Sequence, residues 1–108
     1  MKRYAQMIRL RPEAEAEYIR YHAAVWPTVL ETISACGIRN YSIFLRNSIL
    51  FAYFEYHGMD FDADMAKMSE CPETQRWWKE TDPCQSPLPD AAAKGKIWAD
   101  TKEVYFLK

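Results

Sequence analysis

The stretch Asn40–His57, NYSIFLRNSILFAYFEYH, decides the fold because it predicts two adjacent antiparallel strands. Asn40–Leu45 and Ile49–His57 are rich in aromatic and β-branched residues, and Arg46-Asn47-Ser48 provides a turn between them. Both strands carry apolar residues on both faces. A sheet of this kind needs cover on each side. We therefore expect helices on one face and a second subunit or a ligand on the other.

The chain before this hairpin predicts a strand followed by a broken helix. Lys2–Leu10 alternates in the manner of a strand. Pro12 then suits the first turn of a helix, and Gly37 suits the position just after its end. Pro27 lies inside this helical region, where proline removes a backbone hydrogen bond and clashes with the preceding turn. We expect a kink or a break near Ala24–Pro27.

The chain after the hairpin predicts two short helices, a loop and a strand. Asp60–Met68 and Pro72–Glu80 have helical patterns. Asp82–Lys96 is rich in proline and predicts a long loop, of the kind that forms a lid or a subunit contact. Ile97–Leu107 predicts a final strand.

The resulting order, β-α-β-β-α-β, indicates an α+β fold of the ferredoxin-like type, with an antiparallel sheet and helices on one face. A length of 108 residues predicts one domain, residues 1–108. Because the other sheet face needs cover, we expect a homodimer of the dimeric α/β-barrel type, with two sheets face to face and C2 symmetry.

Composition excludes several classes of partner. The formal net charge of −1 and the lack of a basic stripe argue against nucleic acid. The apolar runs are too short to span a bilayer, so we expect no membrane partner. Cys36, Cys71 and Cys84 are unclustered, and free thiols suit a reducing compartment. The beginning of the chain lacks the profile of a signal peptide. We expect a cytoplasmic protein.

Tyr18, His22 and Trp26 recur at four-residue spacing within EYIRYHAAVWP, Glu17–Pro27. This spacing puts side chains on one stripe of a helix. A single histidine on such a face is commonly a packed or surface residue, and a tyrosine is commonly half-buried. A packing stripe would use Leu or Ile, however, whereas these three side chains have polar tips. We interpret His22 as an acid–base group and Tyr18 as a hydrogen-bonding partner of what His22 contacts.

Trp77 and Trp78 point about 100° apart if they lie on a helix, so one ring can pack while the other faces a cavity. Both could equally fill the core or an interface. An exposed indole face suits the C–H-rich face of a sugar, and a nucleobase fits the charge balance less well. Tyr41 begins a predicted strand and can be either a core aromatic or part of the same site.

No motif for a metal or a phosphate group is present. The chain has no Cys/His cluster, no Asp-rich loop and only three glycines, and it has no nucleophile elbow. His57 lies at a predicted strand end and has no assigned role. We expect a site without metal or cofactor.

Four segments in this order, EYIRYHAAVWP, NYSIFL, TQRWW and EVYFL, resemble the L-rhamnose mutarotase family over nearly the whole chain. The family interconverts the anomers of a deoxyhexose and has a ferredoxin-like, dimeric fold. The resemblance implies His22 as the proton donor. It implies substrate contacts for Tyr18, Tyr41, Trp77 and Trp78. The expected partner is therefore a monosaccharide.

Departures from the family pattern surround the expected sugar pocket. Tyr21, Ala23 and Thr28 differ from the residues typical of rhamnose enzymes, and the segment KETDPCQSPLP lacks their methionine-rich continuation. The sugar is therefore L-rhamnose, L-fucose or another 6-deoxyhexose. Two other classes stay open: a monooxygenase-like enzyme of the dimeric α/β-barrel type, and a sugar-binding module without turnover.

Overall fold

A computed structural model describes all residues, 1–108, and shows an antiparallel sheet in the strand order β2-β3-β1. The long strands are β1 Lys2–Leu10, β2 Ile38–Arg46 and β3 Ile49–Tyr56. The free edge of β1 carries two short strands, β4 Gln85–Ser86 and β5 Ala99–Asp100. The fourth position of the ferredoxin-like sheet is thus divided between two pieces. The predicted fold class is confirmed.

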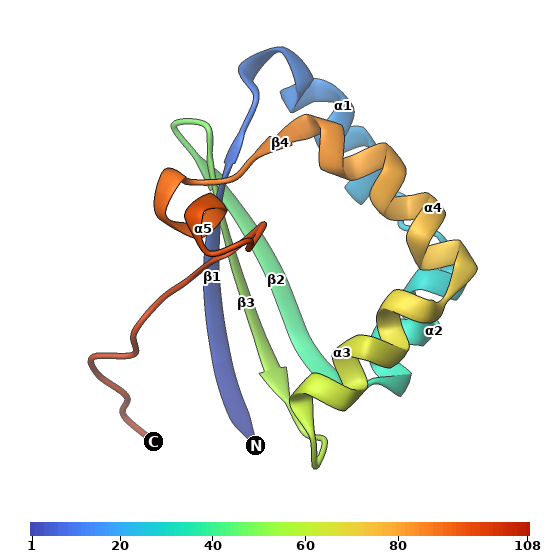
Figure 1. The fold of residues 1–108 in the computed structure, drawn as a ribbon, viewed down its shortest axis with the longest axis vertical. Helices are drawn as coiled ribbons and strands as arrows, with labels where there is room; N and C mark the ends of the chain where they lie inside the picture. Colours follow the sequence, from blue (N-terminus) through green and yellow to red (C-terminus); the bar gives the residue numbers. More distant parts are fainter.

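The helices that shape the molecule lie on one side of this sheet (Figure 1). They are α1 Glu15–His22, α2 Pro27–Ala35, α3 Phe61–Glu70 and α4 Pro72–Thr81. Three shorter pieces are η1 Pro12–Ala14, η2 Asp82–Cys84 and α5 Pro89–Ala93. No helix is both long enough and apolar enough to span a bilayer.

The predicted interruption at Pro27 is a complete break between α1 and α2. Pro27 is the first residue of α2, and Trp26 before it has an extended backbone, with φ −61° and ψ 135°. Proline favours both features, because it fixes its own φ and restricts the residue before it. His22 is consequently the last residue of α1, where it is half-buried and is followed by the turn residues Ala23 and Ala24.

The predicted hairpin is confirmed, and β2 contains a bulge that matters for the site. Asn47 and Ser48 both have positive φ, 51° and 60°, as a two-residue type I′ turn requires. The β2–β3 register shifts between Arg39 and Ser42. A bulge re-aims the side chains around it. Here it places Tyr41 against Phe54 on the helix-facing side, with ring centroids 5.6 Å apart.

Two predictions about the C-terminal third are wrong. Asp82–Lys96 is not an open loop, because it contains η2, β4 and α5 and buries Cys84 and Gln85. The strand predicted for Ile97–Leu107 is reduced to β5. A strand needs a partner, and the last backbone hydrogen bond to β1 is from the Thr101 N–H to the Ala5 carbonyl, at 3.2 Å. Beyond it the chain leaves the sheet (Figure 1).

Candidate functional site

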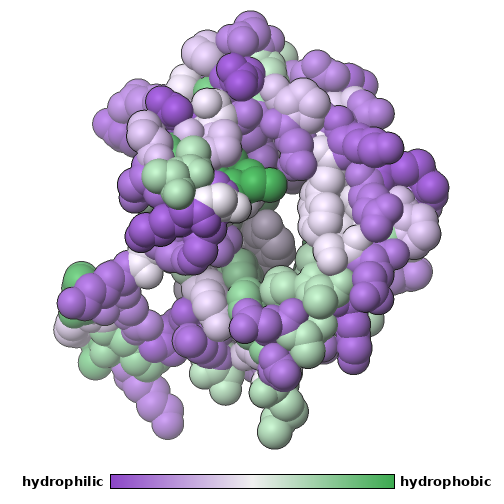
Figure 2. All heavy atoms as spheres, viewed as in Figure 1, coloured by the Kyte–Doolittle hydropathy of each residue, from purple (hydrophilic) through white to green (hydrophobic).

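A cavity of about 690 Å³ lies between the sheet and the helices, and it contains most of the residues predicted from the sequence. Figure 2 shows the molecule hollowed between its sheet side and its helix side. Aliphatic and aromatic side chains form most of the wall. Its chemically distinctive members are His22, Tyr41, Trp77, Trp78, Asp82 and Trp98.

His22 is half-buried and is held by Tyr18 and Trp77. Its ring stacks on Tyr18 with centroids 4.1 Å apart, and meets Trp77 edge-on at 5.3 Å. Its Nδ1 atom is 2.9 Å from the Tyr18 carbonyl oxygen. A carbonyl only accepts, so in the neutral ring the proton is on Nδ1 and Nε2 keeps its lone pair. Burial lowers the pKa of His22 from its ordinary 6.5, and the hydrogen bond to the Tyr18 carbonyl opposes this shift.

Tyr18 is buried beside His22 and is not part of the cavity wall. Its hydroxyl accepts a hydrogen bond from Gln85 Nε2 at 3.3 Å. Burial raises the pKa of the Tyr18 hydroxyl, and the Gln85 hydrogen bond opposes that rise. In the structure Tyr18 therefore supports the imidazole from behind. The substrate contact expected of Tyr18 stays a prediction.

Trp77 and Trp78 both line the cavity but differ in packing. Trp77 is only 6% exposed, and Trp26 meets it edge-on at 5.2 Å. Trp78 is half-buried. Trp26, the third member of the sequence stripe, therefore positions Trp77 without lining the cavity itself.

Tyr41 reaches the cavity from β2. Its residue surface is 43% exposed, yet burial around the hydroxyl raises its pKa to about 12. The hydroxyl is therefore a hydrogen-bonding group and stays protonated near neutral pH.

The cavity wall also includes Gln6, Asp82 and Trp98, which the sequence did not identify as site residues. The sequence pattern could have identified Gln6, since it is the polar member of the helix-facing series of β1. It could also have identified Asp82, since Asp82 comes four residues after Trp78 and therefore near the same helix face. No sequence pattern could have identified Trp98, because its placement depends on how the C-terminal segment crosses β1.

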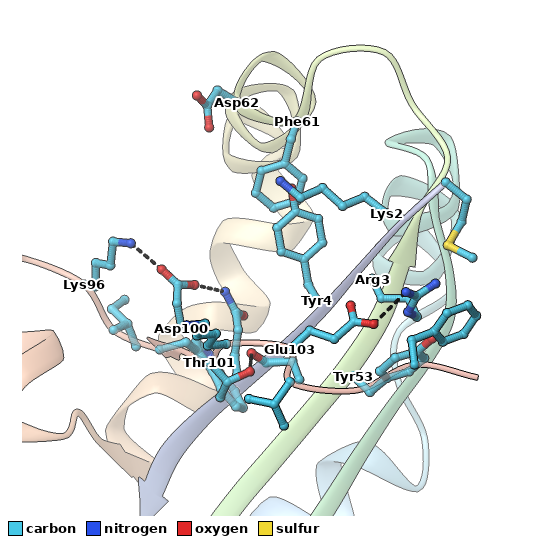
Figure 3. Close-up of a pocket in the computed structure, with 18 of the residues that line it drawn as sticks. Lys2, Arg3, Tyr4, Tyr53, Phe61, Asp62, Lys96, Asp100, Thr101 and Glu103 are labelled. Carbon is cyan, nitrogen blue, oxygen red and sulfur yellow. Dashed lines mark hydrogen bonds and ion pairs between the residues drawn. The ribbon is translucent and has the colours of Figure 1, made fainter. Parts of the chain in front are cut away.

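A larger hollow, of about 1320 Å³, lies beneath the C-terminal segment and borders the smaller cavity at Gln6, Phe61, Ile97 and Trp98 (Figure 3). Arg3 crosses to Glu103 at 2.7 Å, and its guanidinium lies 3.5 Å from the Phe106 ring centroid. None of the five predicted site residues lines this hollow. It is formed by an irregular terminal segment, so the smaller cavity is the candidate active site. No three His, Cys, Asp or Glu side chains come together as a metal-binding group.

Comparison with known proteins identifies relatives over the full length of the chain. The family model described as L-rhamnose mutarotase matches residues 3–107. The L-rhamnose mutarotase of Listeria monocytogenes (serotype 4b, strain F2365) is 36% identical, covering 99% of each chain. That of Bacillus subtilis (strain 168) is 33% identical with the same coverage.

Two solved structures have similar folds. L-rhamnose mutarotase from Formosa agariphila has a TM-score of 0.78 at 22% identity, and tetracenomycin F2 cyclase from Streptomyces glaucescens has 0.63 at 14%. Each alignment covers 100% of both chains. At these identities the likeness shows the fold alone.

Proposed function

Because the chain belongs to the L-rhamnose mutarotase family, whose members are isomerases, we propose that it interconverts the α and β anomers of L-rhamnose or a closely related 6-deoxyhexose. One structural observation supports this proposal most. The imidazole of His22 lines a cavity with two indoles, and its Nε2 atom is free of protein partners in the deduced tautomer. L-fucose is the alternative sugar, because Tyr21, Ala23 and Thr28 differ from the typical rhamnose enzymes.

His22 carries the proton in this proposal. A pyranose changes anomer when the anomeric hydroxyl loses a proton, the ring oxygen gains one and the bond between C1 and the ring oxygen breaks. The free aldehyde then rotates and the ring closes on its other face. Neutral imidazole with a free Nε2 lone pair accepts the first proton and passes it to the ring oxygen. General acid–base help of this kind contributes about 10²–10⁴-fold.

The tryptophans and the cavity wall bind the sugar in this proposal. Trp78 stacks on the ring, since Trp77 is already packed by Trp26 and His22. The Tyr41 hydroxyl orients the sugar hydroxyls, and Tyr18 does so if the sugar reaches past the imidazole. The aliphatic wall suits the methyl group that distinguishes a 6-deoxyhexose from other hexoses.

We also propose a homodimer in the cytosol. Met7, Phe51 and Phe44 form an apolar row across β1, β3 and β2 on the face without helices, as their pairing in the sheet shows. A second copy of the same face would cover this row. The three cysteines are unpaired, as a reducing compartment favours.

Anomer exchange measured by saturation-transfer NMR tests the proposed activity. With L-rhamnose and L-fucose as substrates, His22→Ala should slow exchange by about 10²–10⁴-fold. His57→Ala is the matched control, because His57 lies at the exposed end of β3 outside the cavity. A folded wild-type protein that binds the sugars without accelerating exchange would instead be a sugar-binding module. Preference for a quinol over both sugars would favour the monooxygenase-like class.

A further inference from the structure

Anomer exchange requires proton transfer at more than one position. The anomeric oxygen occupies different places in the α and β sugars, because the aldehyde turns between ring opening and ring closure. The imidazole of His22 cannot follow it freely. Its Nδ1 is held 2.9 Å from the Tyr18 carbonyl oxygen, the Tyr18 ring stacks on it, and Trp77 meets it edge-on.

Only two other titratable side chains line the cavity: Tyr41 and Asp82. Proton transfer is efficient when the pKa of the group is near the operating pH. Burial raises the pKa of Tyr41 to about 12, which makes it a poor partner. Asp82 is an exposed residue as a whole, but partial burial of its carboxyl on the cavity side raises its pKa from an ordinary 3.8, so this shift moves the carboxyl towards neutrality.

Asp82 is also placed for contact with a ligand. It caps the C-terminal end of α4 and begins η2, four residues after Trp78. It forms none of the ion pairs of the structure, and burial alone accounts for its shifted pKa. The charge of Asp82 acts on Tyr18 of α1, and His22 and Tyr41 are the other titratable side chains that line the same cavity. Glu80 and Cys84 lie two residues away in sequence. A carboxylate without a partner beside two indoles is available to a sugar hydroxyl.

We propose that Asp82 is a second catalytic residue, which serves the anomeric oxygen on the side that His22 does not reach. The inference rests on the proposed mutarotase function. In one direction Nε2 of His22 takes the proton of the anomeric hydroxyl. The C1–O5 electron pair moves to O5 as the carbonyl forms at C1, and the proton passes to O5.

Asp82 completes the exchange after the aldehyde has turned. Its carboxylate takes the proton from the O5 hydroxyl while O5 attacks C1. The carbonyl π electrons move to O1, and the proton on Asp82 passes to O1 on the new face. Both groups return to their starting states, and no external oxidant, reductant or co-reactant is consumed.

The test compares Asp82→Asn and Asp82→Glu with Asp90→Asn, an exposed residue in the first turn of α5 outside the cavity. Asparagine keeps the size and hydrogen-bonding capacity of the side chain but cannot carry the proton. Asp82→Asn should slow exchange by about 10²-fold or more while the sugar affinity, measured by tryptophan fluorescence, stays within a few-fold. Asp82→Glu should recover part of the rate. Asp90→Asn should match the wild type.

The pH profile separates proton transfer from mere binding. On the acid side, log kcat/KM of the wild type should approach a slope of two, because both bases must lose a proton. Asp82→Asn should show a slope of one. The inference is overturned if the slope and rate of Asp82→Asn match the wild type, or if only affinity falls. If the wild-type protein does not accelerate exchange, the proposed function itself is refuted. The inference about Asp82 is tested only by the difference between an active wild type and Asp82→Asn, so the two failures can be told apart.

Discussion

At the scale of single residues, His22 obtains both its orientation and its tautomer from Tyr18. The side chain of Tyr18 stacks on the imidazole and its carbonyl fixes the proton on Nδ1. Gln85 in turn fixes the hydroxyl of Tyr18. These contacts leave Nε2 as the reactive atom of His22. They also prevent the imidazole ring from rotating in a way that would bury Nε2. The arrangement favours the neutral imidazole as the working form.

The pH dependence of anomer exchange should therefore follow the loss of a proton from His22. Burial lowers the pKa of His22 below 6.5, so exchange should rise as the pH increases through this lowered value and then level off. The unfolded chain binds this proton more readily, so folding stability falls over the same range as the pH drops. Exchange must therefore be measured only where circular dichroism shows a folded protein. A rate that falls as the pH rises through this range would mean that the imidazolium is the active form.

The sequence predicts the aromatic and imidazole part of the site but not the carboxylate. The four-residue spacing predicts Tyr18, His22 and Trp26 on one stripe, and the structure brings them together with Trp77. The same spacing cannot tell which stripe member faces the cavity, and Tyr18 turns out to lie behind the ring. Asp82 was missed because it falls in a segment that the sequence predicts as a loop.

At the scale of secondary structure, the β2–β3 hairpin positions Tyr41 through its bulge and its turn. The turn fixes the pairing of β2 with β3 from Arg46 back to Ser42, and the bulge between Ser42 and Arg39 shifts this register by its extra residue. Asn47 tolerates positive φ, whereas Ser48 at φ 60° has no such preference. The hairpin therefore contains one strained position.

Replacing Ser48 with glycine should relieve that strain. Glycine adopts positive φ without a steric penalty, and Asn-Gly is the preferred pair for a type I′ turn. Ser48→Gly should raise the free energy of unfolding by about 0.5–1 kcal/mol in urea denaturation. Ala5→Gly, at an exposed and regularly paired position of β1, is the control and should lower it by a similar amount. Equal destabilisation by both variants would show that Ser48 carries no strain.

The elements that the sequence predicts well have local causes, and those it predicts badly depend on distant partners. Pro27 breaks its helix by its own covalent structure, and Asn47 favours the turn because it tolerates positive φ. Ile97–Leu107 has a good strand pattern. It forms only β5, because β1 pairs with it at Gln6 and Met7 and then with β4 at Arg9 and Leu10. No periodicity in the sequence reveals how a sheet edge is shared.

At the scale of the whole molecule, the two faces of the sheet differ in how they are covered. The helices cover one face and enclose the cavity (Figure 1). On the other face Phe44 is 63% exposed and Phe51 is 39% exposed, and the two are cross-strand partners. Val104, Tyr105 and Leu107 of the C-terminal segment are also exposed. Exposed aromatic neighbours on a sheet face are typical of surfaces that bind another protein.

Phe44→Glu should therefore convert a dimer into a monomer. A charge in the middle of an apolar contact loses its hydration without gaining a partner, at a cost of several kcal/mol. Light scattering after gel filtration should give twice 12.7 kDa for the wild type and 12.7 kDa for the variant. Met59→Glu is the matched control, because Met59 is a fully exposed apolar residue after β3 and lies outside the Phe44–Phe51 row. It should leave the dimer intact. If the wild type is a monomer, or if both variants dissociate equally, the helix-free face is not the interface.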